Sequence, residues 1–201
     1  MLALPRGGVP VARQVARLLQ APLDILVVRK IGASGHPELA CGALASGGIL
    51  LWNHDVLQSL RLQEHDLNEI RTHEEQELRI RESALRGSEA PPLDIRAKSI
   101  VIVDDGLATG ASMRAAVQAA RAKRPDTITV AFPVEPERSC KELELLGCSV
   151  VCPLKIESEK FSSVGQWYDD FSQISTGECR RILEEERTRS SSADIYPSPY
   201  L

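Results

Sequence analysis

Residues 100–112, which read IVIVDDGLATGAS, constrain the fold of this chain more than any other segment. Four consecutive aliphatic residues are typical of a strand that is buried on both faces of a parallel sheet. Two aspartates and a turn of small residues follow, and a helical pattern begins at Ser112. A turn between a strand and a helix can direct several backbone N–H groups and the positive end of the helix dipole at one point. The segment therefore predicts an anion site with two acidic side chains beside it.

The Asp104-Asp105 pair is open to two alternative interpretations at this point. An aliphatic strand that ends in two aspartates can bind magnesium in other nucleotide enzymes, and it also occurs where a strand simply leaves the core. Neighbouring carboxylates repel each other unless hydroxyl groups, cations or amides compensate their charge. Because an anion-binding turn follows the pair at once, the pattern favours a site for a phosphorylated sugar.

The rest of the chain alternates strand and helix patterns. Strand patterns occupy residues 2–4, 23–29, 41–45, 49–52, 99–104, 127–134 and 149–154, and helix patterns occupy residues 9–20, 112–123 and 136–146. This alternation predicts an α/β fold with a mostly parallel, doubly wound sheet. In such a sheet the ligand lies beyond the carboxyl ends of the strands. We expect the loop at residues 5–8, the turn at 104–110 and the segment after Val134 to meet there.

The chain of 201 residues can form one substantial core, and we expect a single domain over residues 1–189. A charged helical insertion at about residues 55–90 interrupts this domain. A small C-terminal subdomain is expected around the aromatic segment at residues 161–171. Residues 190–201 are rich in Ser and Pro and are expected to form a disordered tail.

The insertion predicts a long, solvated helix. Oppositely charged residues recur in it at i,i+4 spacing, in the pairs Glu75–Arg79, Glu77–Arg81 and Glu82–Arg86. Its few apolar residues form a narrow stripe, which would pack against the domain or against a second subunit. His65, Glu69 and His73 have the spacing of a metal site on one helix face, but a solvated face is the simpler interpretation among so many charges.

Composition disfavours several classes of function. The net charge of −4 and the aromatic content of 4% argue against a nucleic-acid surface, which is usually basic with interleaved aromatics. No apolar stretch reaches the roughly 18 residues of a membrane span, and the N-terminus lacks the layout of a signal peptide. The five cysteines form no CxxC pair, so neither a disulfide framework nor a structural zinc site is indicated. We therefore expect a cytoplasmic protein that binds neither nucleic acid nor membrane.

Two further segments carry candidate anion-binding residues. In the loop at residues 5–8, the backbone amides of Gly7 and Gly8 can approach an anion closely, and Arg6 adds a positive charge. Arg29 and Lys30 lie at the end of the next strand pattern, ahead of a Gly- and Ala-rich segment that can move.

Residues 100–112 resemble the phosphoribosyl diphosphate (PRPP) motif of the type I phosphoribosyltransferases. The resemblance implies that Asp104 and Asp105 bind the ribose hydroxyls and help to place Mg²⁺, directly or through water. It implies that the following turn binds the 5′-phosphate, through Gly106, Leu107, Ala108, Thr109, Gly110, Ala111 and Ser112. It also implies that Arg6, Gly7 and Gly8 form the diphosphate loop, with a cis peptide bond at Arg6–Gly7.

The resemblance has implications for two more regions. In the family, a mobile loop after the second strand closes over PRPP, which implies a catalytic role for Arg29 and Lys30 at the departing diphosphate. The accepting base is usually recognised by a separate subdomain near the chain ends. Phe161, Trp167 and Tyr168 are the candidates here, although the packing of a small subdomain accounts for these aromatics equally well. A homodimer is the usual arrangement in the family.

Across nearly its full length the chain resembles a group of bacterial phosphoribosyltransferases with no known acceptor, through the LALPRGGVPVA opening and the WYDDFSQ ending. We therefore predict Mg²⁺-dependent transfer of the 5-phosphoribosyl group from PRPP to a nucleobase or another nitrogen acceptor, with release of diphosphate. A module that senses PRPP without turning it over is the alternative. Two features depart from the familiar salvage enzymes: the charged insertion, and a diphosphate loop so close to Met1 that the true start is in question.

Overall fold

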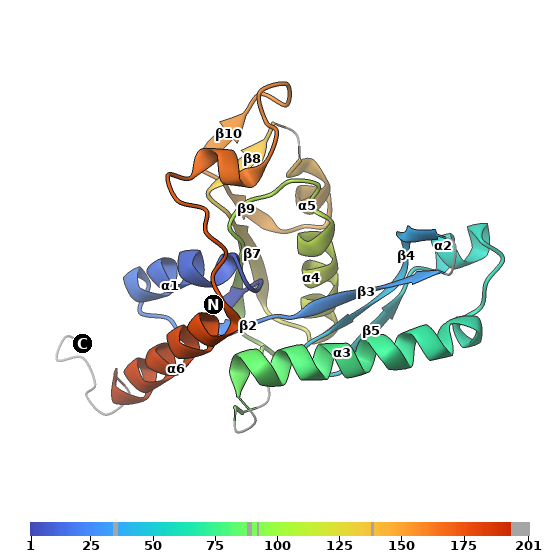
Figure 1. Cartoon of the computed structure of the whole chain (residues 1–201), viewed down its shortest axis with the longest axis horizontal. Helices are drawn as coiled ribbons and strands as arrows, with labels where there is room; N and C mark the ends of the chain where they lie inside the picture. The colour runs from blue at the N-terminus through green and yellow to red at the C-terminus, as the bar shows by residue number, and fades with distance from the viewer. Residues whose placement is uncertain (34–35, 88–89, 92, 138, 194–201) are drawn as a thin grey trace.

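A computed structural model of the chain describes residues 1–33, 36–87, 90–91, 93–137 and 139–193. Its core is a five-stranded sheet in the order β2-β1-β6-β7-β9, in which every neighbouring pair is parallel (Figure 1). The strands are β1 (Leu2–Ala3), β2 (Asp24–Ile25), β6 (Ser99–Val103), β7 (Thr127–Ala131) and β9 (Ser149–Val151). This confirms the predicted mostly parallel α/β sheet. The strand order reverses direction between β1 and β6, which is where such sheets bind ligands.

Helices cover both faces of the core sheet. On one face lie α1 (Gly8–Leu18) and α6 (Thr176–Ala193), and on the other lie α4 (Ala111–Ala122) and α5 (Lys141–Leu145). Successive side chains of β6 point to opposite faces of the sheet. Ile102 packs into the core that includes α4, and Val103 packs into the core that includes α1 and α6. No helix in the described part of the chain is long and apolar enough to cross a membrane.

A second sheet extends away from the core and forms, with two helices, what we call the arm. Its elements are β3 (Val28–Ala33), β4 (His36–Ala45), β5 (Ile49–Trp52), α2 (His54–Ser59), the 3₁₀ turn η1 (Glu64–Leu67) and α3 (Asn68–Arg86). The three strands are antiparallel, and Figure 1 shows them projecting to the right above α3. The apolar stripe of α3 is buried at Leu78, which is 5% exposed, and at Leu85.

Two predictions for this region were wrong in detail. The strand predicted at 23–29 divides, because the backbone of Val27 pairs with Ser46 at the base of the arm instead of continuing in the parallel sheet: Ser46 N donates to Val27 O, and Val27 N donates to Ser46 Oγ, both at 2.9 Å. The predicted single helix is two helices, because Arg61, with φ of 54°, has a left-handed backbone conformation that ends the first.

Prolines account for the remaining corrections. Pro133 and Pro153, which lack a backbone N–H, divide the strands predicted at 127–134 and 149–154. The chain beyond them forms a separate parallel pair, β8 (Val134–Pro136) and β10 (Leu154–Ile156), which lies at the top of Figure 1. Because Pro136 belongs to β8, the helix predicted at 136–146 shortens to α5. The aromatic segment follows β10 and contains the 3₁₀ turn η2 (Val164–Trp167).

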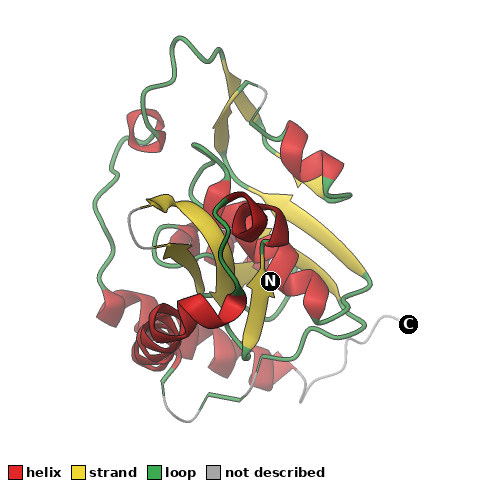
Figure 2. Ribbon diagram, turned by 90° about the vertical axis from the view of Figure 1, so that its right-hand side faces the viewer, coloured by secondary structure: helices red, strands yellow, loops and turns green. Residues whose placement is uncertain are grey.

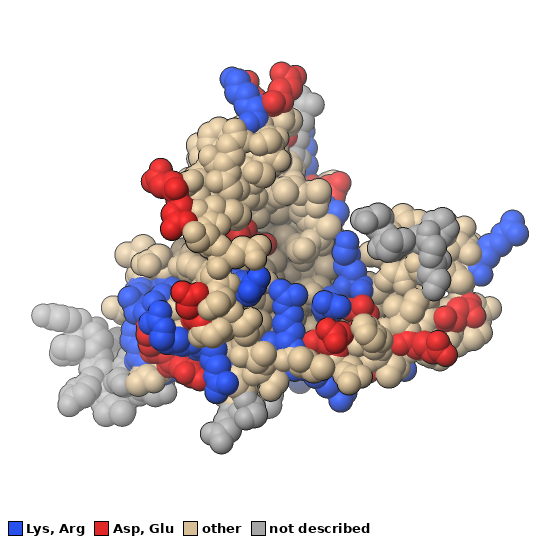
Figure 3. All heavy atoms as spheres, in the orientation of Figure 1, with Lys and Arg blue, Asp and Glu red and all other residues tan. Residues whose placement is uncertain are grey.

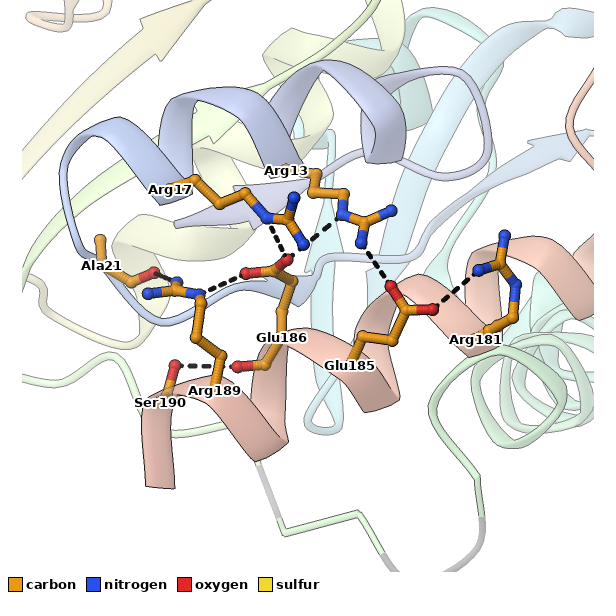
Figure 4. A network of polar contacts seen from close by, with 8 residues as sticks. All are labelled: Arg13, Arg17, Ala21, Arg181, Glu185, Glu186, Arg189 and Ser190. Carbon is orange, nitrogen blue, oxygen red and sulfur yellow. Dashed lines mark hydrogen bonds and ion pairs between the residues drawn. The ribbon is translucent and has the colours of Figure 1, made fainter. Parts of the chain in front are cut away.

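Helix α6 was not predicted, and its last residues replace the start of the predicted tail. Residues 190–193 are helical, and residues 194–201 lie outside the described part. Glu186 of α6 is fully buried and accepts hydrogen bonds from Nε of three arginines: Arg17 and Arg189 at 2.7 Å each, and Arg13 at 3.2 Å (Figure 4). Burial alone would raise the pKa of Glu186, but the bonds and charges of Arg189 and Arg17 lower it below its ordinary value. This network fixes α6 against α1.

Candidate active site

Loop 5–8 and turn 104–110 lie side by side, because they follow β1 and β6 at the point where the sheet order reverses. Leu4 N donates a hydrogen bond of 2.8 Å to Val103 O, which joins the two strand ends. The structure has a cis peptide bond in this loop, as predicted, but it joins Pro5 to Arg6 and therefore lies one residue earlier than expected.

Both glycines of the loop are needed for its contact with the acidic pair. A Cβ atom on Gly7 would overlap the Asp105 carboxylate. A Cβ atom on Gly8 would lie 2.6 Å from Val103 O and 3.0 Å from Asp104 Cα. The loop can approach Asp104 and Asp105 this closely only because these two positions lack side chains.

Asp104 and Asp105 lie partly buried next to each other without a compensating cation from the described residues. Burial, and then the charge of Asp105, raise the pKa of Asp104 to about 7. Burial also raises the pKa of Asp105. The Asp105 amide donates to Asp104 Oδ1 at 3.0 Å. Such a pair has unused acceptor capacity for hydroxyl groups or a cation.

Turn 104–110 leaves backbone donors free. The amides of Ala108, Thr109 and Gly110 donate to no acceptor within the described residues. Gly110 has a φ of 71°, which favours glycine, and it forms the N-cap of α4. Arg114 Nη1 donates to Thr109 O at 2.8 Å and steadies the turn. Free amides at a helix N-terminus are suited to an anion such as a phosphate.

Not every residue of the predicted 5′-phosphate loop faces the ligand space. Leu107 is buried at 2% exposure, and its amide donates to Val134 O at 2.9 Å, so it anchors the turn in the core. Gly106 faces the aromatic segment, because a Cβ there would lie 2.5 Å from Val164 Cγ1. The amides of residues 108–110 and Ser112, at the start of α4, are left for an anion.

The cations predicted from the second strand lie in the arm. Arg29 and Lys30 belong to β3 and line, with Ser112, a pocket of about 500 Å³. Arg29 is not free there, because its Nε and Nη2 both lie 2.6 Å from Glu74 Oε2 of α3. The Gly- and Ala-rich segment that was expected to be a mobile loop forms β3 and β4, and its tip at residues 34–35 lies outside the described part.

A second pocket of about 310 Å³ lies between loop 5–8 and residues 168–174. Those residues belong to a stretch that runs without helix or strand from η2 to α6, drawn as a long green loop in Figure 2. Arg6 reaches across the pocket, where its Nη2 donates to Gln173 Oε1 at 2.9 Å. Asp105 also lines this space, so the acidic pair adjoins it.

The structure places one of the three predicted acceptor residues in this pocket. Tyr168 lines it together with Phe171, with the two ring centres 5.1 Å apart, whereas Phe161 and Trp167 do not. The Tyr168 hydroxyl donates to Asp105 O at 2.6 Å. Burial, followed by the charges of Asp105 and Asp104, raises the pKa of Tyr168 to about 12, so the phenol stays protonated as a donor at neutral pH.

Glu74, Arg81 and Gln173 are among the lining residues of these two pockets that sequence reasoning missed. Glu74 and Arg81 come from the insertion, whose i,i+4 pattern indicated only a solvated surface. In Figure 3, Lys and Arg side chains border the central hollow between the arm and the segment above it. Among the described residues, the pocket lined by Arg29, Lys30 and Arg81 has only Glu74 as an acidic lining residue, and this local excess of positive charge suits a phosphate-bearing ligand.

The acidic pair fits a magnesium ion only when a ligand completes its coordination. No group of three or more His, Cys, Asp or Glu side chains in the described part of the chain could hold a metal by itself. Mg²⁺ is commonly held by one or two carboxylates together with water and substrate phosphates. The desolvated, cation-free oxygens of Asp104 and Asp105 match that donor set.

Comparison with known proteins identifies the family. Residues 1–169 match the family model of the phosphoribosyl transferase domain. Proteins named "Putative phosphoribosyl transferase" in two Mycobacterium tuberculosis strains are 42% identical over 185 residues, which are 92% of this chain and 41% of each relative. The chain thus spans less than half the length of these relatives.

A solved structure, TT1426 from Thermus thermophilus, is 36% identical with a TM-score of 0.78 and covers 92% of this chain and 86% of that chain. On these grounds the chain belongs to the phosphoribosyl transferase domain family.

Proposed function

We propose that the chain transfers the 5-phosphoribosyl group from PRPP to a nucleobase or another nitrogen acceptor, with Mg²⁺ and with release of diphosphate. One observation carries the proposal: the side-chain-free backbone of Gly7 and Gly8 lies directly against Asp104 and Asp105. An amide loop suited to diphosphate and an acidic pair suited to sugar hydroxyls are therefore neighbours. The turn suited to the 5′-phosphate continues from the same pair.

The described residues divide the binding work as follows. The free amides of residues 108–110 and the start of α4 hold the 5′-phosphate. Asp104 and Asp105 accept hydrogen bonds from the ribose hydroxyls. Arg6 and the Gly7 amide hold the diphosphate at the opposite end of the ribose, whereas the Gly8 amide, predicted to share this role, already donates to Leu4 O at 3.0 Å. Fixing both phosphates orients the anomeric carbon toward the acceptor and stabilises the charge that separates as the bond to diphosphate breaks.

Mg²⁺, when bound, neutralises the charge that develops on the leaving diphosphate. Asp104 and Asp105 are the residues that would hold it. Because the pKa of Asp104 is raised to about 7, this carboxyl group must lose its proton near neutral pH before it can bind a cation.

The pocket beside Asp105 favours an enzyme over a sensor of PRPP. Its volume of about 310 Å³ falls within the range of small-molecule sites, and the aromatic rings of Tyr168 and Phe171 offer stacking surfaces. A sensor would need the phosphate loops but no acceptor pocket next to the acidic pair.

Binding of PRPP tests the assignment of the acidic pair. We expect the double variant Asp104→Asn with Asp105→Asn to lose PRPP binding in calorimetry with Mg²⁺, while circular dichroism shows an intact fold. The control is Glu157→Gln with Glu159→Gln, which changes two exposed acids remote from the pockets. Unchanged PRPP affinity in the aspartate variant would refute the assignment.

Turnover tests the enzyme against the sensor. Diphosphate release should be measured with PRPP, Mg²⁺ and a panel of nucleobases and other nitrogen acceptors. We expect release with at least one acceptor. Tight PRPP binding without release in the presence of any acceptor would favour the sensor.

A further inference from the structure

Arg81 of the arm lies between the two pockets of the site. Among the residues that the structure describes, it alone lines both: the pocket with Arg6 and Asp105, and the pocket with Arg29 and Lys30. It is therefore placed between the predicted diphosphate loop and the cations of β3. Neither the PRPP motif nor the aromatic segment contains this residue.

No described carboxylate forms an ion pair with Arg81. The predicted i,i+4 pair with Glu77 does not form, whereas the predicted pair between Glu82 and Arg86 does, at 3.2 Å. The single hydrogen bond of Arg81 is long, 3.5 Å from Nη2 to Pro5 O. Because a guanidinium has five N–H donors, most of them stay available to a ligand.

The helical repeat explains why α3 faces the site with both Arg81 and Glu74. These residues are seven positions apart, which is close to two turns, so their side chains leave the same side of the helix. Ile70, one turn before Glu74, lines the second pocket as well. The insertion therefore has a defined inner face, on which Glu74 holds Arg29 and Arg81 stays unpaired.

The end of α3 that carries Arg81 is firmly attached to the core. Arg86, which is 6% exposed, donates from Nε to Asp24 Oδ1 at 2.9 Å and from Nη2 to Asp24 Oδ2 at 2.6 Å. Arg187 of α6 donates to Arg86 O at 2.8 Å. A fixed helix holds a ligand-binding side chain more accurately than a loop does.

We propose that Arg81 binds the diphosphate of PRPP, so that the helical insertion forms one wall of the ligand site. This inference rests on the proposed function. A planar guanidinium can bond two phosphate oxygens at once, and Arg81 lines the same pocket as Arg6 and Gly7 of the predicted diphosphate loop. Because Arg81 borders both pockets, it can keep its contact with the diphosphate before and after the bond to ribose breaks.

The test compares Arg81→Gln with Arg79→Gln, an exposed arginine of the same helix that lines neither pocket. Calorimetry with Mg²⁺ should use three probes: PRPP, inorganic diphosphate and ribose 5-phosphate. We expect Arg81→Gln to weaken binding of PRPP and diphosphate roughly ten- to hundredfold, the range of a lost charge-assisted contact. Binding of ribose 5-phosphate should change less than about twofold, and Arg79→Gln should match the unaltered protein.

The outcomes separate a ligand contact from structural support. Equal weakening for all three probes would mean that Arg81 only supports loop 5–8 through Pro5 O, which would overturn the inference. Unchanged diphosphate affinity in Arg81→Gln would overturn it too. If the unaltered protein bound neither PRPP nor diphosphate, the proposed function itself would fail.

Discussion

Two carboxylate sites of the protein lie in opposite electrostatic settings. At the α1–α6 contact, Glu186 is bonded by three arginines, and its pKa is lowered despite complete burial. At the edge of the core sheet, Asp104 and Asp105 are desolvated side by side without such partners, and the pKa of Asp104 is raised to about 7.

The difference between the two sites shows where the protein leaves carboxylate charge unpaired, so that a ligand or cation can neutralise it. Removing a carboxylate from water is unfavourable in both places. At Glu186 the protein supplies the compensating cations, and the product is a fixed helix. At the acidic pair the compensation is missing from the described residues, which is typical of a site that functions with an external partner. Three experiments can break or sharpen this comparison.

The largest effect is expected at the compensated site. Replacing Glu186 by Ala leaves the three arginines without their shared acceptor and should lower the free energy of unfolding by about 3–5 kcal/mol. Urea denaturation followed by circular dichroism measures it. Glu184→Ala is the control on the same helix, since Glu184 is an exposed partner of Arg180 and should matter by less than about 1 kcal/mol. A loss for Glu186→Ala as small as that of the control would show that the network is not structural.

An intermediate effect is expected where the loop meets the acidic pair. In Gly7→Ala the new Cβ collides with the Asp105 carboxylate, so either the loop or the side chain must move. Because small displacements of a catalytic group can reduce rate about hundredfold, we expect a loss of that order in PRPP-dependent diphosphate release. Gly177→Ala is the control, because the nearest atom to its Cβ would be 4.0 Å away. Full activity in Gly7→Ala would argue against this contact.

The smallest effect concerns stability and pH at the uncompensated pair. An acid whose pKa is raised by folding stabilises the protein fully below its unfolded value, near 4, and loses that contribution as pH rises through about 7. In Asp104→Asn the side chain cannot ionise, so the variant does not lose stability as the pH rises through about 7. We therefore expect the variant to melt about 2–4 °C above the unaltered protein at pH 8, corresponding to roughly 1 kcal/mol, with the difference shrinking toward pH 4. Asp169→Asn, at an exposed acid, serves as the control. A melting difference that does not vary with pH would contradict the assignment.

The core sheet and its turn were predictable because local sequence determines them. The aliphatic run, the acidic pair and Gly110 each have a conformational meaning that does not depend on distant residues. The sequence also contained a signal for the divided strands, because Pro133 and Pro153 have no backbone N–H to donate in a sheet. The apolar patterns continue across both prolines, and the strands were therefore predicted as unbroken. Helix α6 had a local signal that was overlooked: Ser175 and Glu178 form a capping box, with the Glu178 amide donating to Ser175 Oγ at 3.2 Å.

The contribution of the arm to the site could not be predicted in the same way. Whether Arg81 pairs with Glu77 or faces a pocket depends on how α3 lies on the core, which the Arg86–Asp24 bond and α6 determine. Arg29 posed the same difficulty, because its partner Glu74 lies 45 residues later in the chain. Contacts between distant segments leave no periodic pattern in the sequence.

The contact between the aromatic segment and the acidic turn has a consequence for engineering. Tyr168 is tied to the carbonyl of Asp105, and Gly106 has no room for a side chain beside Val164. A chimaera that imports this segment from a relative must therefore bring a matching Tyr168 and Val164, or it will displace the acidic pair and the turn that follows it. Directed evolution toward new acceptors should begin at Ser172, which lines the same pocket, and should leave Phe171 unchanged, because its ring packs with its centre 5.1 Å from that of Tyr168.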